Sequence, residues 1–268
     1  SIDEPNEILT EKYERTRNLR LQIAIEFNDT NLVSHDNKTC LYCTFPLIGS
    51  EKHQLPFILN CPDFEPDTER QFLMLEGEDE IYIEDNKTKE KKKMINLPKI
   101  NKSILKRSLD LFKELLSYLM ENKFNNFHFL TNGLSEKYIK TDFTDIKHMN
   151  EDWYRTNIIF PMRKILEDSK IVKTIDDQMT NLKDAYFPIY EEKSNKEQRE
   201  MYHKLLCHKY PNKTVTFEES ESWRNRLWES PNLITIERLV SDEEALGIEK
   251  EEGKKKIEEK EWEYLNLL

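Results

Sequence analysis

The chain has 268 residues and a formal net charge of −11, with 35% charged and 37% hydrophobic residues. Its 13 Phe, 11 Tyr and 4 Trp supply enough large apolar surface for a core, but only 5 Gly are present and neither GxGxxG nor GxxxxGK occurs, which argues against a glycine-rich phosphate loop. The acidic charge opposes binding to nucleic acid and anionic lipid, and no apolar run approaches the ~20 residues of a membrane-spanning helix. These features predict a cytoplasmic protein of one large or two smaller domains, without membrane contact.

The first residues indicate a cut within a longer protein. The chain opens SIDEPNEILTEKYERTRNLRLQ without an initial Met, so we expect an active partner domain to be missing from this fragment. Residues 5–19 are predicted to form a short helix, because Ile8, Leu9 and Tyr13 follow helical spacing.

Three apolar runs in the next forty residues predict strands. Leu21–Phe27 alternates apolar and polar residues, whereas Thr39–Leu47 and Leu55–Cys61 are rich in aromatic and aliphatic residues and are bounded by turn residues. A hairpin or a strand pair joined through Ile48–Gln54 is the simplest connection. Ile81–Ile83 is predicted to be a further short strand.

The clearest element is an amphipathic helix over Asn101–Asn122. Its apolar residues recur at i, i+4, i+7 and i+8, and either Asn101 or Ser103 could cap its first turn. A strand or turn is predicted over Phe124–Leu130, and Asn132-Gly133 ends this part of the chain.

The second half is predicted to be rich in helix. A helix over Asp145–Asp168 should kink or restart at Pro161, because proline lacks the backbone N–H. The remaining predicted elements are a strand at Ile171–Ile175, an extended piece within Leu182–Tyr190, helices at Ser194–Lys209 and Glu219–Trp228, and a charged helix or tail at Ser241–Leu268.

This order of elements predicts an α+β fold with mixed α/β layers, in which a small sheet and a long amphipathic helix precede a helix-rich second half. We expect a sheet-containing unit over residues 1–140, a helix-rich unit with short strands over 141–240, and the charged segment 241–268.

Several groups of reactive residues are candidates for a metal or catalytic site. Cys40, Cys43 and His35 would give a structural zinc only three ligands, because the sequence has no second CxxC motif. His203, Cys207 and His208 likewise have no further metal ligand nearby in sequence. The carboxylates Asp63, Glu65, Asp67 and Glu69 lack the DxDxDG pattern of a calcium loop and are expected to form a solvated acidic turn. We expect no metal site. A hydrolase with its own cleft and nucleic-acid binding through the basic stretches Lys87–Lys93 and Lys99–Arg107 remain alternatives that no motif supports.

Arg70 differs because of its setting. It follows a strand and a proline-containing acidic loop, and prolines reduce the freedom of such a loop. A planar guanidinium that is always charged suits bidentate contact with a phosphate. An ion pair with Glu65, Asp67 or Glu69 is the alternative role of Arg70.

The segments Tyr42–Leu47, Leu55–Asn60 and Thr68–Arg70 resemble the region that follows the ATPase domain in sacsin-like proteins. There, a strand similar to FxPLP precedes a second strand, and a loop with one or two arginines follows. The stretch Val172–Pro188, which ends in DAYFP, resembles a later passage of the same proteins. The resemblance covers residues 20–125 and, more faintly, 150–230.

A more distant resemblance is to the middle domain of heat shock protein 90 chaperones, of the same GHKL superfamily. There, a turn with the sequence Ser-Arg-Glu carries an arginine that contacts the γ-phosphate of ATP held by the preceding domain. The corresponding position is Arg70, in the sequence Glu-Arg-Gln, and Asn101–Asn122 resembles the long helix.

The resemblance implies the middle region of a bacterial chaperone-like ATP-binding protein. Its partners would be its own N-terminal ATPase domain and a client or partner protein, with Arg70 reaching the nucleotide in trans. ATP and Mg²⁺ are expected on the missing domain, with no cofactor in this fragment, and any ATPase activity would belong to the full-length protein. The alternative is a non-enzymatic interaction scaffold, with Trp223, Trp228 and the charged C-terminal segment as its contact surface. For the two tryptophans themselves, residue type favours ordinary core over an exposed surface.

Overall fold

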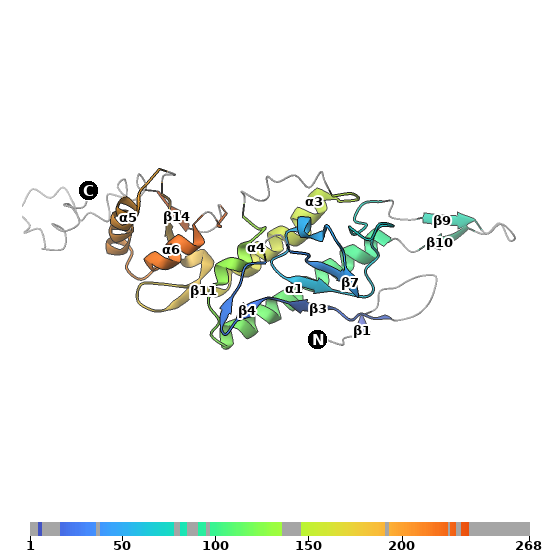
Figure 1. Ribbon diagram of the computed structural model, residues 1–268, viewed down its shortest axis with the longest axis horizontal. Coiled ribbons are helices and arrows are strands. Elements are labelled where there is room, and N and C mark those ends of the chain that lie inside the picture. The colour runs from blue at the N-terminus through green and yellow to red at the C-terminus, as the bar shows by residue number, and fades with distance from the viewer. Residues whose placement is uncertain are drawn as a thin grey trace, which may run out of the picture. The chain divides into compact units, whose positions relative to one another are not determined.

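The computed structural model in Figure 1 describes residues 5–6, 17–35, 38–77, 81–84, 91–94, 97–135, 146–190, 193–224, 226–228 and 232–235. The chain divides into two compact units, Ser1–Ile165 (unit 1) and Leu166–Leu268 (unit 2). Helices and small sheets occur together, so the predicted α+β class is confirmed. The predicted boundary at 140/141 and the segment 241–268 lie outside the described residues. No helix in the described ranges is long and apolar enough to cross a membrane.

Unit 1 is built on a four-stranded sheet with the order β3-β8-β6-β7. The strands are β3 (Gln22–Ala24), β8 (Ile58–Asn60), β6 (Leu41–Cys43) and β7 (Phe45–Pro46). β3 and β7 run antiparallel to their neighbours, whereas β6 and β8 are parallel and pair Leu41 with Leu59. Of the two expected connections between the second and third apolar runs, the strand pair joined through Ile48–Gln54 is confirmed and the hairpin is wrong, because β6 and β8 are parallel and the 3₁₀-helix η1 (Ser50–His53) lies in the crossover between them.

The predicted strand over Thr39–Leu47 is broken at Thr44. This residue has φ 65°, which turns the chain back so that Cys43 pairs with Phe45. The left-handed region is costly for a β-branched residue, so this tight turn is strained. β7 is the edge strand of the sheet, where Pro46 is tolerated because its neighbour on one side is solvent.

Three further two-stranded pairs occur in the part of unit 1 that the structure describes. β1 (Pro5–Asn6) pairs with β2 (Arg17–Asn18), so the helix expected over residues 5–19 is wrong at both of its described ends, where the backbone is extended and paired. β4 (Phe27–Asn28) pairs with β5 (Asn31–Leu32), and β9 (Ile81–Glu84) pairs with β10 (Lys91–Met94).

The long helix α1 (Leu97–Glu121) confirms the strongest sequence prediction but begins four residues earlier than Asn101. Its buried face includes Ile104, Leu105 and Phe112, and the Phe112 ring lies 5.1 Å from that of Phe57 at the start of β8. Asn101 is therefore inside the helix, and its predicted capping role is wrong.

The second helical stretch of unit 1 runs through α3 (Glu151–Tyr154), the π-helical η4 (Arg155–Ile159) and α4 (Phe160–Glu167), which crosses into unit 2. Asn150 caps α3 by accepting from Trp153 N. Pro161 lies just after the π-helical turn η4, in a helical stretch that continues without a break from Glu151 to Glu167, so the helix does not restart there and is irregular in the turn before the proline.

A 3₁₀-helix, η2 (Phe127–Thr131), occupies the segment where a strand or turn was expected, and Gly133 follows it with φ 78°. A Cβ at Gly133 would lie 2.2 Å from the Gln54 carbonyl oxygen, so only glycine fits this contact.

The described residues of unit 2 that follow α4 form two small sheets and two α-helices. β11 (Lys170–Lys173) pairs antiparallel with β12 (Met179–Asn181), and β13 (Tyr186–Pro188), which follows the 3₁₀-helix η5 (Leu182–Asp184), pairs in parallel with β14 (Asn232–Ile234). The helices are α5 (Lys196–Lys209) and α6 (Phe217–Trp223). Tyr202, Leu205, Leu206 and Ile234 form a buried cluster between α5 and β14.

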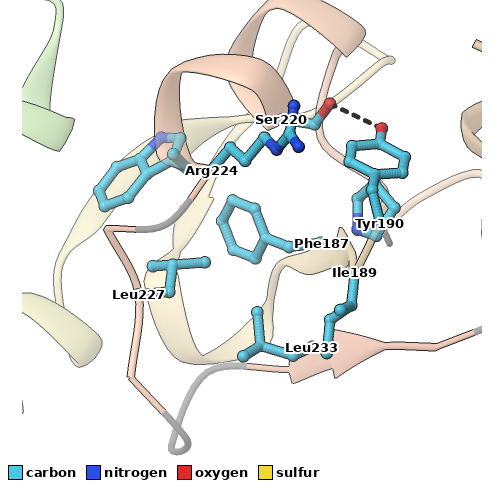
Figure 2. A pocket seen from close by; sticks show the side chains of 9 residues that line it. Phe187, Ile189, Tyr190, Ser220, Arg224, Leu227 and Leu233 are labelled. Carbon is cyan, nitrogen blue, oxygen red and sulfur yellow. Dashed lines mark hydrogen bonds between the residues drawn. The ribbon is translucent and has the colours of Figure 1, made fainter. Parts of the chain in front are cut away.

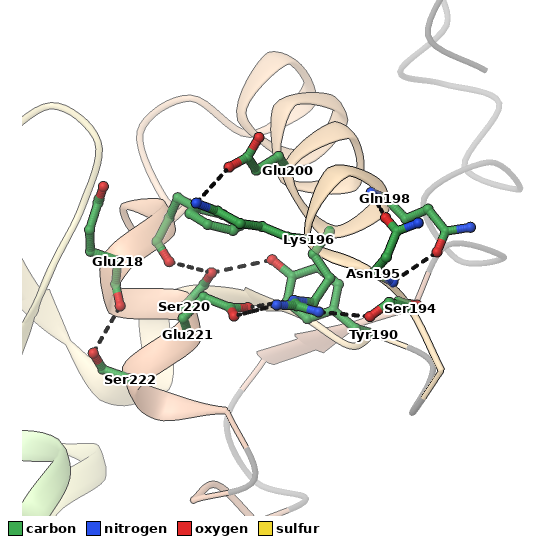
Figure 3. Close-up of polar contacts among 12 residues, drawn as sticks. Tyr190, Ser194, Asn195, Lys196, Gln198, Glu200, Glu218, Ser220, Glu221 and Ser222 are labelled. Atoms are coloured by element: carbon green, nitrogen blue, oxygen red, sulfur yellow. Dashed lines mark hydrogen bonds and ion pairs between the residues drawn. The ribbon is translucent and has the colours of Figure 1, made fainter.

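Local capping explains where the helices of unit 2 begin. At the start of α5, Asn195 and Gln198 form a reciprocal capping box, which Figure 3 shows beside the ion pair between Lys196 and Glu200. Thr216 caps α6 by accepting from Glu219 N. The sequence-based helix over Glu219–Trp228 ends too late, because the helix stops at Trp223 and Trp228 lies in the loop that follows.

Candidate functional site

The residues around Arg70 form a closed loop, Pro66–Leu73, which we call the Arg70 loop. Pro66 and Leu73 form an antiparallel bridge at its base. Inside it, Asp67 N donates to Phe72 O at 2.8 Å and Arg70 N donates to Asp67 O at 3.0 Å. The loop is thus held by its own backbone hydrogen bonds.

The carboxylate of Asp67 holds the C-terminal side of the loop. Its Oδ1 accepts from Gln71 N at 2.8 Å and from Phe72 N at 3.2 Å, and the residue is buried. A buried carboxylate that accepts backbone N–H groups is a strong local constraint because the hydrogen bonds are charge-assisted. Asp67 therefore shapes the loop and is not the ion-pair partner of Arg70 that the sequence allowed.

Asn101 of α1 clamps the base of the Arg70 loop. Its Oδ1 accepts from Glu65 N at 2.8 Å, and its Nδ2 donates to Glu65 O at 2.7 Å and to Met74 O at 3.0 Å. The side chain is fully buried. One amide thus fixes the chain just before and just after the loop to the longest helix of unit 1.

Arg70 itself has φ 56° and its side chain is exposed. Its Nη2 donates to the carbonyl oxygen of Cys43, at the end of β6, over 3.2 Å. Of the other acids considered, Glu69 binds Lys147 Nζ at 3.2 Å. Within the described residues Arg70 forms no ion pair, so its charge faces solvent and most of its donors are available.

Two exposed apolar side chains accompany Arg70. Phe45 is 69% and Ile48 is 73% exposed, the two highest values among the large apolar residues that the structure describes. Phe45 lies two residues after Cys43, which Arg70 contacts, and Ile48 precedes Gly49, where a Cβ would lie 3.3 Å from the Phe72 ring. We call Phe45 and Ile48 the apolar pair.

Sequence reasoning singled out Arg70 but missed both Asn101 as its support and the apolar pair as its neighbour. A signal for Asn101 was present, since it is a polar residue on the apolar face of a strongly amphipathic helix. The apolar pair had no such signal, because Phe45 and Ile48 occur in runs that resemble buried strand.

The cysteines near β6 are structural. Cys40 Sγ donates to Ser50 O at 2.8 Å, and Cys43 Sγ donates to Phe64 O at 3.3 Å. The two thiols thus form hydrogen bonds with backbone carbonyls of different segments. Burial raises the pKa of the Cys40 thiol to about 12. Across the described ranges, no group of three or more His, Cys, Asp or Glu side chains could hold a metal ion.

His203 and Cys207 of α5 do contact each other. His203 Nε2 donates to Val215 O at 2.8 Å, which leaves Nδ1 as the acceptor for the Cys207 thiol at 3.4 Å. Burial raises the pKa of Cys207 to about 11 and lowers the pKa of His203. Both shifts oppose a thiolate–imidazolium pair, so this contact stabilises α5 and does not activate a nucleophile.

The two tryptophans proposed as a scaffold surface are buried. Trp223 is 1% and Trp228 is 2% exposed, with Trp223 Nε1 donating to Glu219 Oε2 at 2.7 Å and Trp228 Nε1 to Glu167 Oε1 at 2.6 Å. Ordinary core, the favoured role of the two residues, is therefore confirmed, and the alternative of an exposed contact surface is wrong for them because both indole rings are enclosed within unit 2.

A scan against models of protein families, a search of curated proteins and a search of solved structures found no match to this chain. The comparisons therefore assign it no family.

Proposed function

We propose that this chain is the middle region of a bacterial sacsin-like, heat shock protein 90-like ATP-binding protein. Its role would be to couple the nucleotide state of an N-terminal ATPase domain to the binding of a client or partner protein. The observation that supports this proposal is the exposed guanidinium of Arg70, which a closed loop holds and which has no ion pair within the described part of the chain.

Arg70 has the properties of a γ-phosphate contact supplied in trans. The Asp67 and Asn101 hydrogen bonds fix the loop backbone, and the contact with Cys43 O restrains the guanidinium. A restrained arginine loses little entropy when it binds an anion, so more of its binding energy is available for the transition state. ATP and Mg²⁺ would be bound by the N-terminal domain, and arginines that play this part elsewhere raise the rate of phosphoryl transfer by roughly 10³–10⁵-fold.

The surroundings of Arg70 also suit a domain interface. The apolar pair would bury its exposed surface when another domain covers it, and Lys52 adds a second cation 5.8 Å from the Phe72 ring centroid. We further propose a cytoplasmic location, in which the four free thiols would remain reduced. The alternative of a scaffold without nucleotide coupling would need a contact surface other than Trp223 and Trp228.

The test uses the full-length protein and compares ATP turnover in wild type, Arg70→Ala and Arg70→Lys. We expect both variants to lose at least tenfold in turnover while ATP affinity stays within about twofold, because the arginine acts on the transition state and lysine cannot make the bidentate contact. Arg20→Ala, at another exposed arginine of unit 1, is the matched control. Unchanged turnover in Arg70→Ala would remove this residue from the mechanism. The 268-residue chain alone should show no ATP binding by calorimetry. Clear binding would contradict the proposal that the N-terminal domain holds the nucleotide.

A further inference from the structure

Unit 2 has a pocket of ≈ 220 Å³ formed by β13, β14, α6 and the loops that follow them (Figure 2). Most of its wall is apolar. The apolar side chains that line it include Phe187, Ile189, Trp223, Leu227 and Leu233. This pocket lies in a different unit from Arg70 and plays no part in the proposed nucleotide coupling.

The floor of the pocket is buried and its rim is partly exposed to solvent. Phe187 and Trp223 are buried and their rings lie 5.9 Å apart, whereas Ile189 is exposed and Leu227 and Leu233 are half-buried. An apolar group that entered the pocket would therefore displace water from the rim and contact a preformed aromatic floor.

The polar residues of the pocket gather on one side. Figure 2 shows the guanidinium of Arg224 beside the hydroxyl pair of Tyr190 and Ser220, whose oxygens are 3.2 Å apart, and on the far side of Phe187 from Leu233. Arg224 lies 5.9 Å from the centre of the Tyr190 ring. Ser220 Oγ donates to Phe217 O at 2.8 Å and therefore accepts from the Tyr190 hydroxyl, so both hydroxyl protons are engaged. Arg224 is thus the hydrogen-bond donor of the pocket that is available to a ligand.

The acids closest to Arg224 in sequence are already engaged. Glu221 accepts three hydrogen bonds from the Arg199 guanidinium, between 3.0 and 3.2 Å, and Glu219 accepts from Trp223 Nε1. Arg224 has no ion-pair partner among the residues that the structure describes. The pocket thus combines an apolar cavity with an uncompensated positive charge at its edge.

The size and the charge together define the ligand. Sites for small-molecule ligands and cofactors enclose about 300–1,000 Å³, so a cavity of ≈ 220 Å³ suits a single large side chain better. A carboxylate next to that side chain would be complementary to Arg224. We propose that this pocket binds a peptide segment of a partner protein through one large apolar side chain with an acidic residue beside it in sequence.

The binding test uses the full 268-residue chain and synthetic capped hexapeptides, with saturation-transfer NMR and titration. The first probe is Gly-Ser-Leu-Glu-Ser-Gly; the second replaces Leu by Ala, and the third replaces Glu by Gln. Wild type should transfer saturation to the Leu methyl groups of the first probe, and the Ala probe should bind at least tenfold more weakly, because it loses most of the buried apolar surface. No transfer to the Leu probe at millimolar concentration overturns the proposal.

The role of Arg224 is tested by a double-mutant cycle. In wild type the Gln probe should bind about threefold more weakly than the Glu probe, and in Arg224→Gln the two probes should bind equally. Lys204→Gln, which removes an exposed charge from α5, is the control and should retain the wild-type difference. A Glu-to-Gln difference that persists in Arg224→Gln overturns the assignment of the carboxylate contact.

The cavity is tested by Leu227→Trp, which fills the pocket from its half-buried rim. This variant should abolish binding of the Leu probe while its thermal unfolding midpoint stays close to that of wild type. Undiminished binding would mean that the peptide binds elsewhere. If Leu227→Trp unfolds, the wild-type probes and the Arg224→Gln cycle still decide the matter.

Discussion

Asn101 and Glu65 are joined by two hydrogen bonds of opposite direction, with Glu65 N donating to Asn101 Oδ1 and Asn101 Nδ2 donating to Glu65 O. A side-chain amide thus replaces the backbone partner that a neighbouring strand would provide. Because Asn101 lies in the first turns of α1, this contact ties the Arg70 loop to the most extensive buried face of unit 1. The position of Arg70 therefore depends on a residue 31 positions further along the chain.

Asn101→Ala should lower the free energy of unfolding by about 3 kcal/mol. The change removes three hydrogen bonds, so that the N–H and C=O of Glu65 and the C=O of Met74, which are partly buried, lose their side-chain partner. Urea denaturation followed by circular dichroism measures the loss. Ser103→Ala, on the exposed side of the same helix, is the control and should stay within about 0.5 kcal/mol of wild type. A loss below 1 kcal/mol for Asn101→Ala would show that the clamp is dispensable.

The stability of unit 1 should fall in mild acid because of His53. Burial lowers the pKa of this imidazole from 6.5 to about 4, and its Nδ1 lies 3.2 Å from Ser50 O. Between these two pKa values the unfolded chain binds the proton and the folded chain does not, so stability is complete above pH 6.5 and is lost as the pH falls toward 4.

Between pH 7 and pH 4.5 this single group should cost about 2 kcal/mol of stability. Urea denaturation at both pH values, for wild type and for His53→Asn, measures the effect. The variant keeps a donor near Ser50 O but cannot take up the proton, so its stability should depend less on pH by that amount. An equal pH dependence in the two proteins would mean that His53 is not the group responsible.

The Cys207 thiol should be unreactive in the folded protein. Its pKa of about 11 leaves a far smaller thiolate fraction at pH 8 than an unfolded cysteine has, so alkylation by iodoacetamide should be on the order of 100-fold slower than in urea. Peptide mass spectrometry over a time course measures the rate at this residue. Alkylation at pH 8 that comes within tenfold of the rate in urea would instead indicate a stabilised thiolate beside His203. Cys207 would then be an activated nucleophile, contrary to this prediction.

Local sequence pattern was sufficient for the regular elements. The spacing of Ile104, Leu105 and Phe112 determines which face of α1 is buried, since that face depends only on the helical period. An irregular helix near Pro161 was predictable for the same reason, because the missing N–H acts within one turn. Arg70 was identified as a candidate from its neighbours in sequence alone.

The sequence could not determine how separated segments meet. Nothing near Leu41 or Leu59 specifies that β6 and β8 run in parallel, because either direction buries the same apolar faces. Residue type favoured core for Trp223 and Trp228, but only the structure of unit 2 excludes them as the exposed surface of a scaffold.

The amino-acid sequence by itself determined the α+β class, the long amphipathic helix and Arg70 as the residue to examine, because these follow from periodicity and residue chemistry within a few turns of chain. Only the tertiary structure decided that Arg70 contacts Cys43, that Asn101 supports its loop, and that Arg224 lies at the edge of an apolar pocket. Each of these depends on contacts between residues far apart in the chain, and their geometry is set by packing of the whole unit and not by local propensity.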